Sequence, residues 1–282
     1  MSAANKENGL LFDDMALLPS LVIQPIYLVS NEEFEARSVK NIVGGEMLLR
    51  VHQKSNGEPF HLGRFFDLVE QEGRLCEVDL FVLSQAFHFI KERESELNPI
   101  GSPPLRLNIN ITPQTLINSE AVLLIHEIME KNKHLAKNLC FELVESYDLS
   151  DIELITATLN SLSQTGAVIA FDDFGAGYIN TETLHHAYDA NVSYIKFDHL
   201  ITSAIGKDHE KTSYAKQTME IACDMGIKTL AEGVEHEHVF NHASLMGFHL
   251  AQGRWLSHEL SVSEFFALLH ENDGNQELLT AD

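Results

Sequence analysis

Short apolar runs that each carry a polar residue at or near their end recur along most of this chain. The first of a regular series is Asn110, in Leu-Asn-Ile-Asn-Ile-Thr, and the later members follow after steps of 32, 30, 24, 36 and 20 residues. These later members are Glu142, Asp172, Lys196, Glu232 and Gln252. One strand and one helix fit in each step, which is the repeat of a (β/α)8 barrel. The spacing therefore predicts an α/β fold with a single TIM-like barrel.

Eight strands are expected, with helical stretches such as 152–164 and 214–225 between the later ones. The expected strands are 21–28, 42–51, 105–111, 139–144, 167–171, 192–197, 228–231 and 248–251. The short link between the first two favours a hairpin, because parallel neighbours need a long crossover, so the first strand should run antiparallel to the rest. The barrel is expected over residues 20–270, between a polar arm at 1–19 and an acidic tail at 271–282.

Two adjacent carboxylates, Asp172 and Asp173, stand where the apolar run 167–171 gives way to Phe-Gly-Ala-Gly-Tyr. Neighbouring side chains of a strand point to opposite faces, so both can serve one centre only if the strand ends between them and the loop turns Asp173 back. The glycines permit such a turn. A capped strand-to-loop junction with solvated aspartates would have the same pattern.

Polar groups at the strand ends of a barrel converge on one mouth. Five carboxylates gathered there with the single ammonium of Lys196 could not stay ionised and close together without cations to offset their repulsion and desolvation. The sequence therefore predicts a divalent metal centre. Its candidate ligands are Glu46, Asn110, Glu142, Asp172, Asp173 and Glu232.

Strand alternation assigns further side chains around Glu46. Glu46, Leu48 and Arg50 share one face of their strand and are expected in the mouth, whereas Met47 and Leu49 face the surrounding helices. The planar donor fork of Arg50 suits a phosphate oxygen, although pairing with a neighbouring carboxylate would use the same fork.

Lys196 and Asp198 share a face for the same reason. A lone lysine among carboxylates would also form an interior salt bridge, whatever else it does. Asn110 could likewise be a satisfied interior amide rather than a ligand.

Seven motifs in a fixed order resemble the EAL-domain cyclic di-GMP phosphodiesterases. They are Glu-Met-Leu-Leu-Arg, Asn-Ile-Thr, Glu-Leu-Val-Glu, Asp-Asp-Phe-Gly-Ala-Gly-Tyr, Lys-Phe-Asp, Ala-Glu-Gly-Val-Glu and Gln-Gly, between about Gln24 and Gln252. The ordered set is far more specific than any one motif. The resemblance implies a barrel whose first strand is antiparallel and an enzyme that hydrolyses cyclic di-GMP to linear 5′-pGpG.

The resemblance also implies roles for individual residues. One Mg²⁺ or Mn²⁺ would be held by Glu46, Asn110, Glu142 and Asp172, and a second by Asp172, Asp173 and Glu232. Lys196 would orient the attacking water, while Ca²⁺ would bind and inhibit. Glu145 and Glu235 would hold loops in place. The substrate groove would be lined by Gln24, Leu48, Arg50, Asp198, Gln252 and Gly253.

The loop after Asp173 departs from the family pattern. The family usually continues with Ser-Ser-Leu after the tyrosine, whereas this chain has Ile179-Asn180-Thr181. In the family this loop couples dimerisation to the metal site, so a homodimer through the loop is expected, with its regulation in doubt. A regulatory protein partner is a further expectation.

Two non-enzymatic alternatives use the same scaffold. A cyclic di-GMP receptor without activity, or a pure protein-interaction module, would be expected to lack Glu46, Lys196 or another member of the metal set. All of these residues are present.

Composition excludes other classes of function. The net charge of −23, from 19 basic and 42 acidic residues, argues against binding of a long nucleic acid, which needs basic patches. No apolar run reaches the roughly 18 residues of a membrane helix, and the first residues lack a signal-peptide plan, so a cytoplasmic location is expected.

Neither the cysteines nor the histidines predict zinc. Cys76, Cys140 and Cys223 form no close pair and are expected to be reduced core residues. His236 and His238, two apart on an expected helix, are expected to point in different directions.

Overall fold

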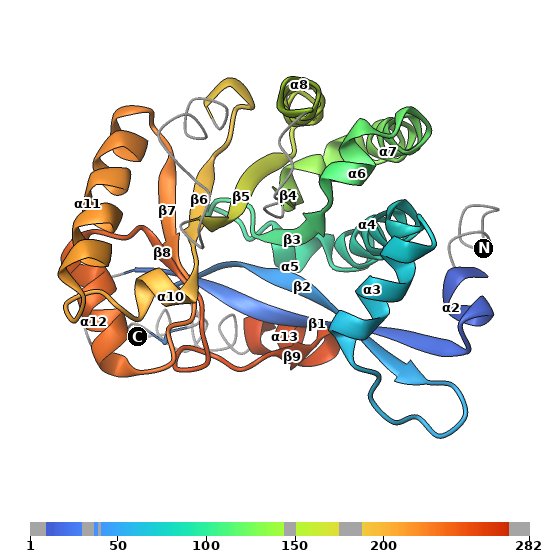
Figure 1. The fold of residues 1–282 in the computed structure, drawn as a ribbon, viewed down its shortest axis with the longest axis horizontal. Coiled ribbons are helices and arrows are strands. Elements are labelled where there is room, and N and C mark those ends of the chain that lie inside the picture. The colour runs from blue at the N-terminus through green and yellow to red at the C-terminus, as the bar shows by residue number, and fades with distance from the viewer. Residues whose placement is uncertain (1–9, 30–36, 39–40, 144–150, 175–187, 271–282) are drawn as a thin grey trace, which may run out of the picture.

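The computed structural model describes residues 10–29, 37–38, 41–143, 151–174 and 188–270. Within these ranges nine strands form one sheet in the order β2-β3-β4-β5-β6-β7-β8-β1-β9, and pairing of β1 with β2 closes it into a barrel (Figure 1). The strands are β1 (Leu17–Leu28), β2 (Ile42–Gln53), β3 (Arg106–Ile111), β4 (Leu139–Leu143), β5 (Val168–Phe174), β6 (Tyr194–Phe197), β7 (Lys228–Ala231), β8 (Leu250–Ala251) and β9 (Leu260–Ser261).

The direction of β1 differs from that of the other barrel strands. β1 pairs antiparallel with β2, with Gln24 opposite Glu46, and antiparallel with β8 on its other edge. The pairs from β2 through β8 are parallel. The predicted eight-stranded barrel and its reversed first strand are therefore confirmed. The short β9, which was not predicted, adds to β1 at Val22 and Ile23.

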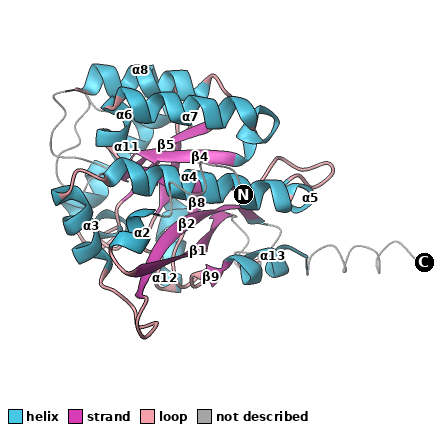
Figure 2. Ribbon diagram, turned by 90° about the vertical axis from the view of Figure 1, so that its right-hand side faces the viewer, coloured by secondary structure: helices cyan, strands magenta, loops and turns pink. Residues whose placement is uncertain are grey.

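Helices surround the barrel and cover the outer faces of its strands (Figures 1 and 2). Helix α4 packs on β3, α8 on β5, α11 on β7 and α13 on β1. The helices are α2 (Leu10–Asp14), α3 (Leu62–Gln71), α4 (Leu75–Glu92), α5 (Glu94–Leu97), α6 (Pro113–Ile117), α7 (Ser119–Lys131), the 3-10 helix η3 (Lys133–Asn138), α8 (Ile152–Ser163), α10 (His199–Thr202), α11 (His209–Asp224), α12 (Glu237–Met246) and α13 (Val262–His270). None of the described helices is both long and apolar enough to cross a lipid bilayer.

Buried apolar side chains form two clusters, one outside the barrel strands and one inside the barrel. The larger one lies between strands and helices and includes Met47 and Leu49, as alternation along β2 predicts. The smaller one fills the middle of the barrel, two residues along each strand from a polar residue of the predicted mouth. Its buried members are Ile26, Cys140, Ala170, Tyr194, Leu230 and Leu250.

The folded region begins earlier than the predicted boundary at residue 20. Helix α2 buries Leu11 and Phe12 in the main core, where the ring of Phe12 stacks on Phe65. Part of the segment expected as a polar arm, 1–19, is therefore packed against the barrel, because burial of these two apolar side chains is favourable.

The cysteines carry free thiols, as predicted, but only one of them is a core residue. Cys140 is buried inside the barrel, Cys76 is half-buried and Cys223 is exposed.

Candidate active site

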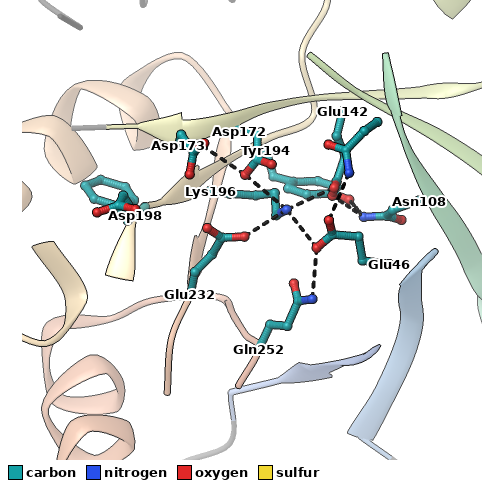
Figure 3. A network of polar contacts seen from close by, with 12 residues as sticks. Glu46, Asn108, Glu142, Asp172, Asp173, Tyr194, Lys196, Asp198, Glu232 and Gln252 are labelled. Atoms are coloured by element: carbon teal, nitrogen blue, oxygen red, sulfur yellow. Dashed lines mark hydrogen bonds and ion pairs between the residues drawn. The ribbon is translucent and has the colours of Figure 1, made fainter. Parts of the chain in front are cut away.

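Lys196 is the centre of an ion-pair cluster at the carboxyl ends of the barrel strands (Figure 3). Its side chain is fully buried, and its Nζ lies 3.1 Å from Glu46 Oε2, 2.9 Å from Glu142 Oε2, 3.0 Å from Asp172 Oδ1 and 2.8 Å from Glu232 Oε1. The five residues come from β2, β4, β5, β6 and the residue after β7. The structure therefore shows the predicted convergence of these side chains.

A local irregularity of β5 brings both adjacent aspartates to this cluster. Asp173 has φ +54°, the left-handed region that favours glycine, and the register between β5 and β6 shifts between Phe171 and Phe174. The Asp173 N–H donates to Asp172 Oδ1 at 2.9 Å. The strand continues to Phe174, so the turn predicted for a strand end is made by a bulge inside the strand.

The carboxylates form two groups of three that share Asp172. One group is Glu46, Glu142 and Asp172, and the other is Asp172, Asp173 and Glu232. Within each group the candidate ligand oxygens all lie within 4.8 Å of one another. Carboxylate oxygens at such separations suit hard divalent cations such as Mg²⁺ and Mn²⁺.

Burial and crowding decide the protonation of the cluster. Burial raises the pKa of Glu142 to about 8, despite the charge of Lys196, and it also raises the pKa of Asp172 and, well above its usual range, of Glu232. Burial, then the negative charges of Asp172 and Asp198, raises the pKa of Asp173 to about 6.

Two members of the cluster keep their charge. For Glu46, burial is outweighed by the Lys196 charge and by hydrogen bonds from Gln252, Lys196 and Asn110, so the pKa is lowered. For Lys196, burial is outweighed by four carboxylates, so the pKa lies well above its usual range. One ammonium cannot neutralise all these acids, and divalent ions would replace the protons that the others retain.

Three amide side chains complete this mouth of the barrel. Asn110 Nδ2 donates to Glu46 Oε1 at 3.1 Å, and Gln252 Nε2 donates to Glu46 Oε2 at 2.9 Å and to Gln24 Oε1 at 3.1 Å. Asn110 Oδ1 and Gln252 Oε1 are buried and have no hydrogen-bond partner among the described residues. A buried amide oxygen without a donor is costly, so both oxygens are open to a ligand. Of the two polar atoms of the Asn110 amide, only the nitrogen has a hydrogen-bond partner, so Asn110 is not a fully satisfied interior amide.

Asn108 belongs to this network, although it was not predicted. Its Nδ2 donates to Glu142 Oε1 at 2.7 Å and to the hydroxyl of Tyr194, which lies 3.2 Å from Cys140 Sγ. Asn108 is 1% exposed. The signal that could have found it was strand alternation, since Asn108 lies two residues before Asn110 on the same face of β3.

Arg50 and Leu48 lie where alternation along β2 places them, both half-buried. The Arg50 guanidinium pairs with Glu259 and also donates from Nη1 to Leu49 O at 2.8 Å. The carboxylate pairing considered for Arg50 is therefore present.

Asp198 and Gly253 have clear structural roles. Asp198 caps α10, accepting from Leu200 N at 2.7 Å, and its other oxygen lies 3.0 Å from His199 Nδ1. A Cβ on Gly253 would lie 2.3 Å from Val234 N, so only glycine fits there. Both residues lie close to the cluster, because Asp198 comes two residues after Lys196 and Gly253 directly follows Gln252.

Other predicted residues lie apart from the cluster or outside the described ranges. Glu235 is exposed, and the described part of the chain gives its carboxylate no ion pair or hydrogen bond. Glu145 lies outside the described residues, as does the expected dimer loop from Phe174 to Leu184 apart from Phe174 itself.

The side chains of His236 and His238 do not point in different directions, so this expectation was wrong. The rings of His236 and His238 stack with centroids 5.5 Å apart. His236 is the extended N-cap residue before α12 and not part of the helix, so helical spacing does not apply. Among the described residues, neither histidine joins a group with metal-binding geometry.

Comparison with known proteins assigns this acidic barrel to a family. The EAL domain family model matches residues 24–259, so the chain belongs to the EAL domain family. The chain is 27% identical over 266 residues to the biofilm architecture maintenance protein MbaA of Vibrio cholerae, covering 93% of this chain and 31% of that protein. It is 29% identical over 192 residues to the probable cyclic di-GMP phosphodiesterase PdeG of Escherichia coli K12, covering 68% of this chain and 36% of that protein. It thus spans about a third of the length of these curated relatives.

Solved structures show the same fold. One is described as the PaMucR phosphodiesterase in complex with c-di-GMP; it has a TM-score of 0.75 and 21% identity, and covers 94% of this chain and 100% of that one.

Proposed function

We propose that this chain is a divalent-metal-dependent phosphodiesterase that opens cyclic di-GMP to linear 5′-pGpG. The observation that carries the proposal is the pair of carboxylate groups that share Asp172 around Lys196. Membership of the EAL domain family supports it, as do a relative named as a probable cyclic di-GMP phosphodiesterase and a similar structure described as a c-di-GMP complex.

The residues present fit a pair of Mg²⁺ or Mn²⁺ ions. The first ion would take Glu46, Glu142, Asp172 and the partnerless oxygen of Asn110, and the second would take Asp172, Asp173 and Glu232. Bound ions of this kind make a water molecule more acidic and offset the charge of the phosphate it attacks. All of these ligands are oxygens, which favours Mg²⁺ or Mn²⁺ over zinc.

Lys196 would act both before and during the attack of water on the phosphate. Lys196 fixes the orientation of four carboxylates through its ion pairs, and its ammonium would also hydrogen-bond the attacking water. The water oxygen forms a bond to phosphorus while the bond from phosphorus to the 3′ oxygen breaks. The 3′ oxygen then takes a proton, which leaves a 5′-phosphate and a free 3′-hydroxyl.

Substrate binding would use the half-buried side of the mouth. Arg50 would exchange its Glu259 carboxylate for a phosphate oxygen of the dinucleotide, because its donor fork suits either partner. Leu48 offers an apolar surface beside it, and the open Oε1 of Gln252 offers an acceptor. Gln24 holds Gln252 in place. Asp198 and Gly253 would shape the groove without binding directly.

Association as a homodimer through the loop after Asp173 is part of the proposal. A shift of Asp173 would change the second ligand group, so dimerisation would tune the site. Light scattering over a concentration range, with activity per subunit, tests it. A monomer that is equally active at every concentration would contradict the coupling.

The enzymatic assignment is tested by incubation with cyclic di-GMP and Mg²⁺, followed by chromatography of the nucleotides. We expect 5′-pGpG to accumulate with Mg²⁺ or Mn²⁺ and little product with Ca²⁺, whose looser coordination does not hold the tight geometry of two small ions. Tight binding without any product would instead identify a receptor.

A further inference from the structure

The opposite mouth of the barrel, at the amino ends of the parallel strands, opens on a large cavity. Its volume is ≈ 1630 Å³, above the roughly 300–1,000 Å³ of ordinary small-molecule pockets. The strand residues on its wall include Leu28, Ile42, Val168, Arg106 and Lys228. This cavity lies on the far side of the middle apolar layer from the carboxylates that surround Lys196.

Gly44 on β2 lines this cavity, and a Cβ at this position would lie 2.2 Å from the backbone oxygen of Arg106. No side chain therefore fits at this point of β2.

Two basic residues face the cavity from opposite walls. Arg106 comes four residues before Asn110 on β3, and Lys228 comes four residues before Glu232 at the end of β7, so the two occupy the same layer of the barrel. Strands β3 and β7 are separated by three strands in the sheet order. Long side chains from opposite walls of one barrel layer can reach a common ligand.

These two cations have no acidic partner within the described residues. Two acidic residues line the rim, Glu96 and Asp189, but Glu96 is already paired with Arg93 and His270. Arg106 and Lys228 thus bring two positive charges to this mouth, whereas the opposite mouth gathers the carboxylates around Lys196.

A buried donor without a partner points to a missing acceptor at this mouth. In the described part of the chain five buried side-chain atoms have no partner, and two of them, Asn110 Oδ1 and Gln252 Oε1, belong to the carboxylate cluster around Lys196. A third, the donor Arg106 Nε, belongs to a residue that lines the cavity. Such atoms cost free energy unless a ligand or water satisfies them.

From the apolar wall, the two cations and the partnerless Nε of Arg106, we infer that this mouth binds a small organic anion. Its oxyanion head, a phosphate monoester or a carboxylate, contacts Arg106 and Lys228. Its apolar body packs against Ile42, Val168 and Leu250, which all line the cavity. Arg106 suits such a head because its planar fork donates two parallel hydrogen bonds to an oxyanion.

The test is isothermal calorimetry of the full chain in EDTA with octyl phosphate and with octanoate, which share an apolar body and differ in the head. Octanol is the control for the apolar body alone, and inorganic phosphate is the control for the anionic head alone. We expect at least one of the two amphiphilic anions to bind at one site, at least tenfold more tightly than either control. The tighter of the two identifies the head.

Substitutions then locate the bound anion. Arg106→Gln should weaken binding tenfold or more, Lys228→Gln severalfold, and Arg50→Gln at the metal mouth should leave it unchanged. Lys228 is exposed, so its variant folds even if the Arg106 variant does not. The inference is overturned if neither anion binds, if the Lys228 variant binds as tightly as the parent, or if Arg50→Gln abolishes binding.

Discussion

Asp172 and Asp173 are neighbours in one strand, yet their carboxylates belong to the same ligand group with Glu232. The left-handed backbone at Asp173 makes this possible, because an extended strand would place the two carboxylates on opposite faces. The energy stored in this unfavourable conformation, on the order of 1–3 kcal/mol, is the cost of presenting two ligands from consecutive positions.

Replacing Asp172 with asparagine should abolish hydrolysis while the fold persists. The amide oxygen introduced by D172N can still accept from Lys196 and from the Asp173 N–H, but it cannot supply a charge shared by two ions. We expect kcat to fall by roughly a thousandfold or more, the equivalent of several kcal/mol. Asp224→Asn, an exposed position at the end of α11, is the matched control and should be fully active. Turnover of D172N at the parental rate would contradict the shared-ligand assignment.

Replacing Lys196 with methionine should destabilise the protein most when divalent ions are removed. Four carboxylates would lose their common counter-charge, and breaking buried pairs of this kind typically costs about 3–5 kcal/mol. We expect a clear fall of Tm in EDTA, partly restored by Mg²⁺, together with a larger loss in kcat than in substrate affinity. Lys54→Met removes only an exposed pair with Asp13 and should change Tm little. Equal Tm values for K196M and the parent in EDTA would rule out this role.

Replacing Arg50 with alanine should weaken substrate binding more than turnover. We expect KM to rise about tenfold or more and kcat to change by less than about threefold. Glu259→Gln is the informative partner, since it frees the guanidinium and should leave KM equal or lower. Calorimetry with cyclic di-GMP in Ca²⁺ measures the affinities without rapid turnover. A fall in kcat at constant KM would instead assign Arg50 to the chemical step.

Replacing Asn108 with alanine should weaken metal binding although Asn108 itself is not a proposed ligand. Its amide orients Glu142, and loss of such a supporting hydrogen bond typically lowers metal affinity by about 10–100-fold. Tyr194→Phe keeps the bond between Asn108 and Glu142 and should have a smaller effect. Calorimetric titration with Mn²⁺ checks both variants. An unchanged Mn²⁺ affinity in Asn108→Ala would show that Glu142 needs no such support.

Replacing Asp79 with asparagine should change how stability depends on pH. Burial raises the pKa of Asp79 to about 6 in the folded protein, against 3.8 as the ordinary value, although Thr112 and Thr115 donate to it. The folded state therefore holds this proton more tightly. Its stabilising contribution is complete below about pH 4 and is lost as the pH rises through about 6, by about 3 kcal/mol in all.

The measurement for Asp79 is the free energy of unfolding by urea at intervals from about pH 3 to about pH 7, a range that spans both pKa values. Relative to Asp79→Asn, the parent should lose stability over this interval and then stay level. Asp67→Asn, an exposed position on α3, should follow the parent. Parallel curves for the parent and Asp79→Asn would contradict the raised pKa.

The fold and most of the carboxylate cluster were predictable because both depend on spacing along the chain. Inward residues of parallel strands repeat with each strand-helix unit, so the sequence alone could place Glu142, Asp172, Lys196 and Glu232 at one mouth. The hairpin of β1 and β2 followed from the short link between them. These are local rules that tertiary contacts do not override.

The parts that escaped prediction depend on contacts between distant segments. The pairing of Arg50 with Glu259 joins residues 209 positions apart, and no sequence rule specifies it. Asn108 shares its strand face with Asn110, so alternation alone could not say which of the two contacts Glu142. Helix α2 was missed because its five residues, Leu10–Asp14, are too few to show a helical period.

The reversed direction of β1 also determines how this barrel can be joined to other parts of a protein. The start of β1 pairs with the far end of β2, beyond Glu46, so α2 approaches from the side of the carboxylates around Lys196. The end of α13, at His270, instead lines the opposite cavity. In a longer chain, a module attached before α2 would act on one end of the barrel and a module attached after α13 on the other. Modules on the two flanks would thus influence opposite mouths of the barrel.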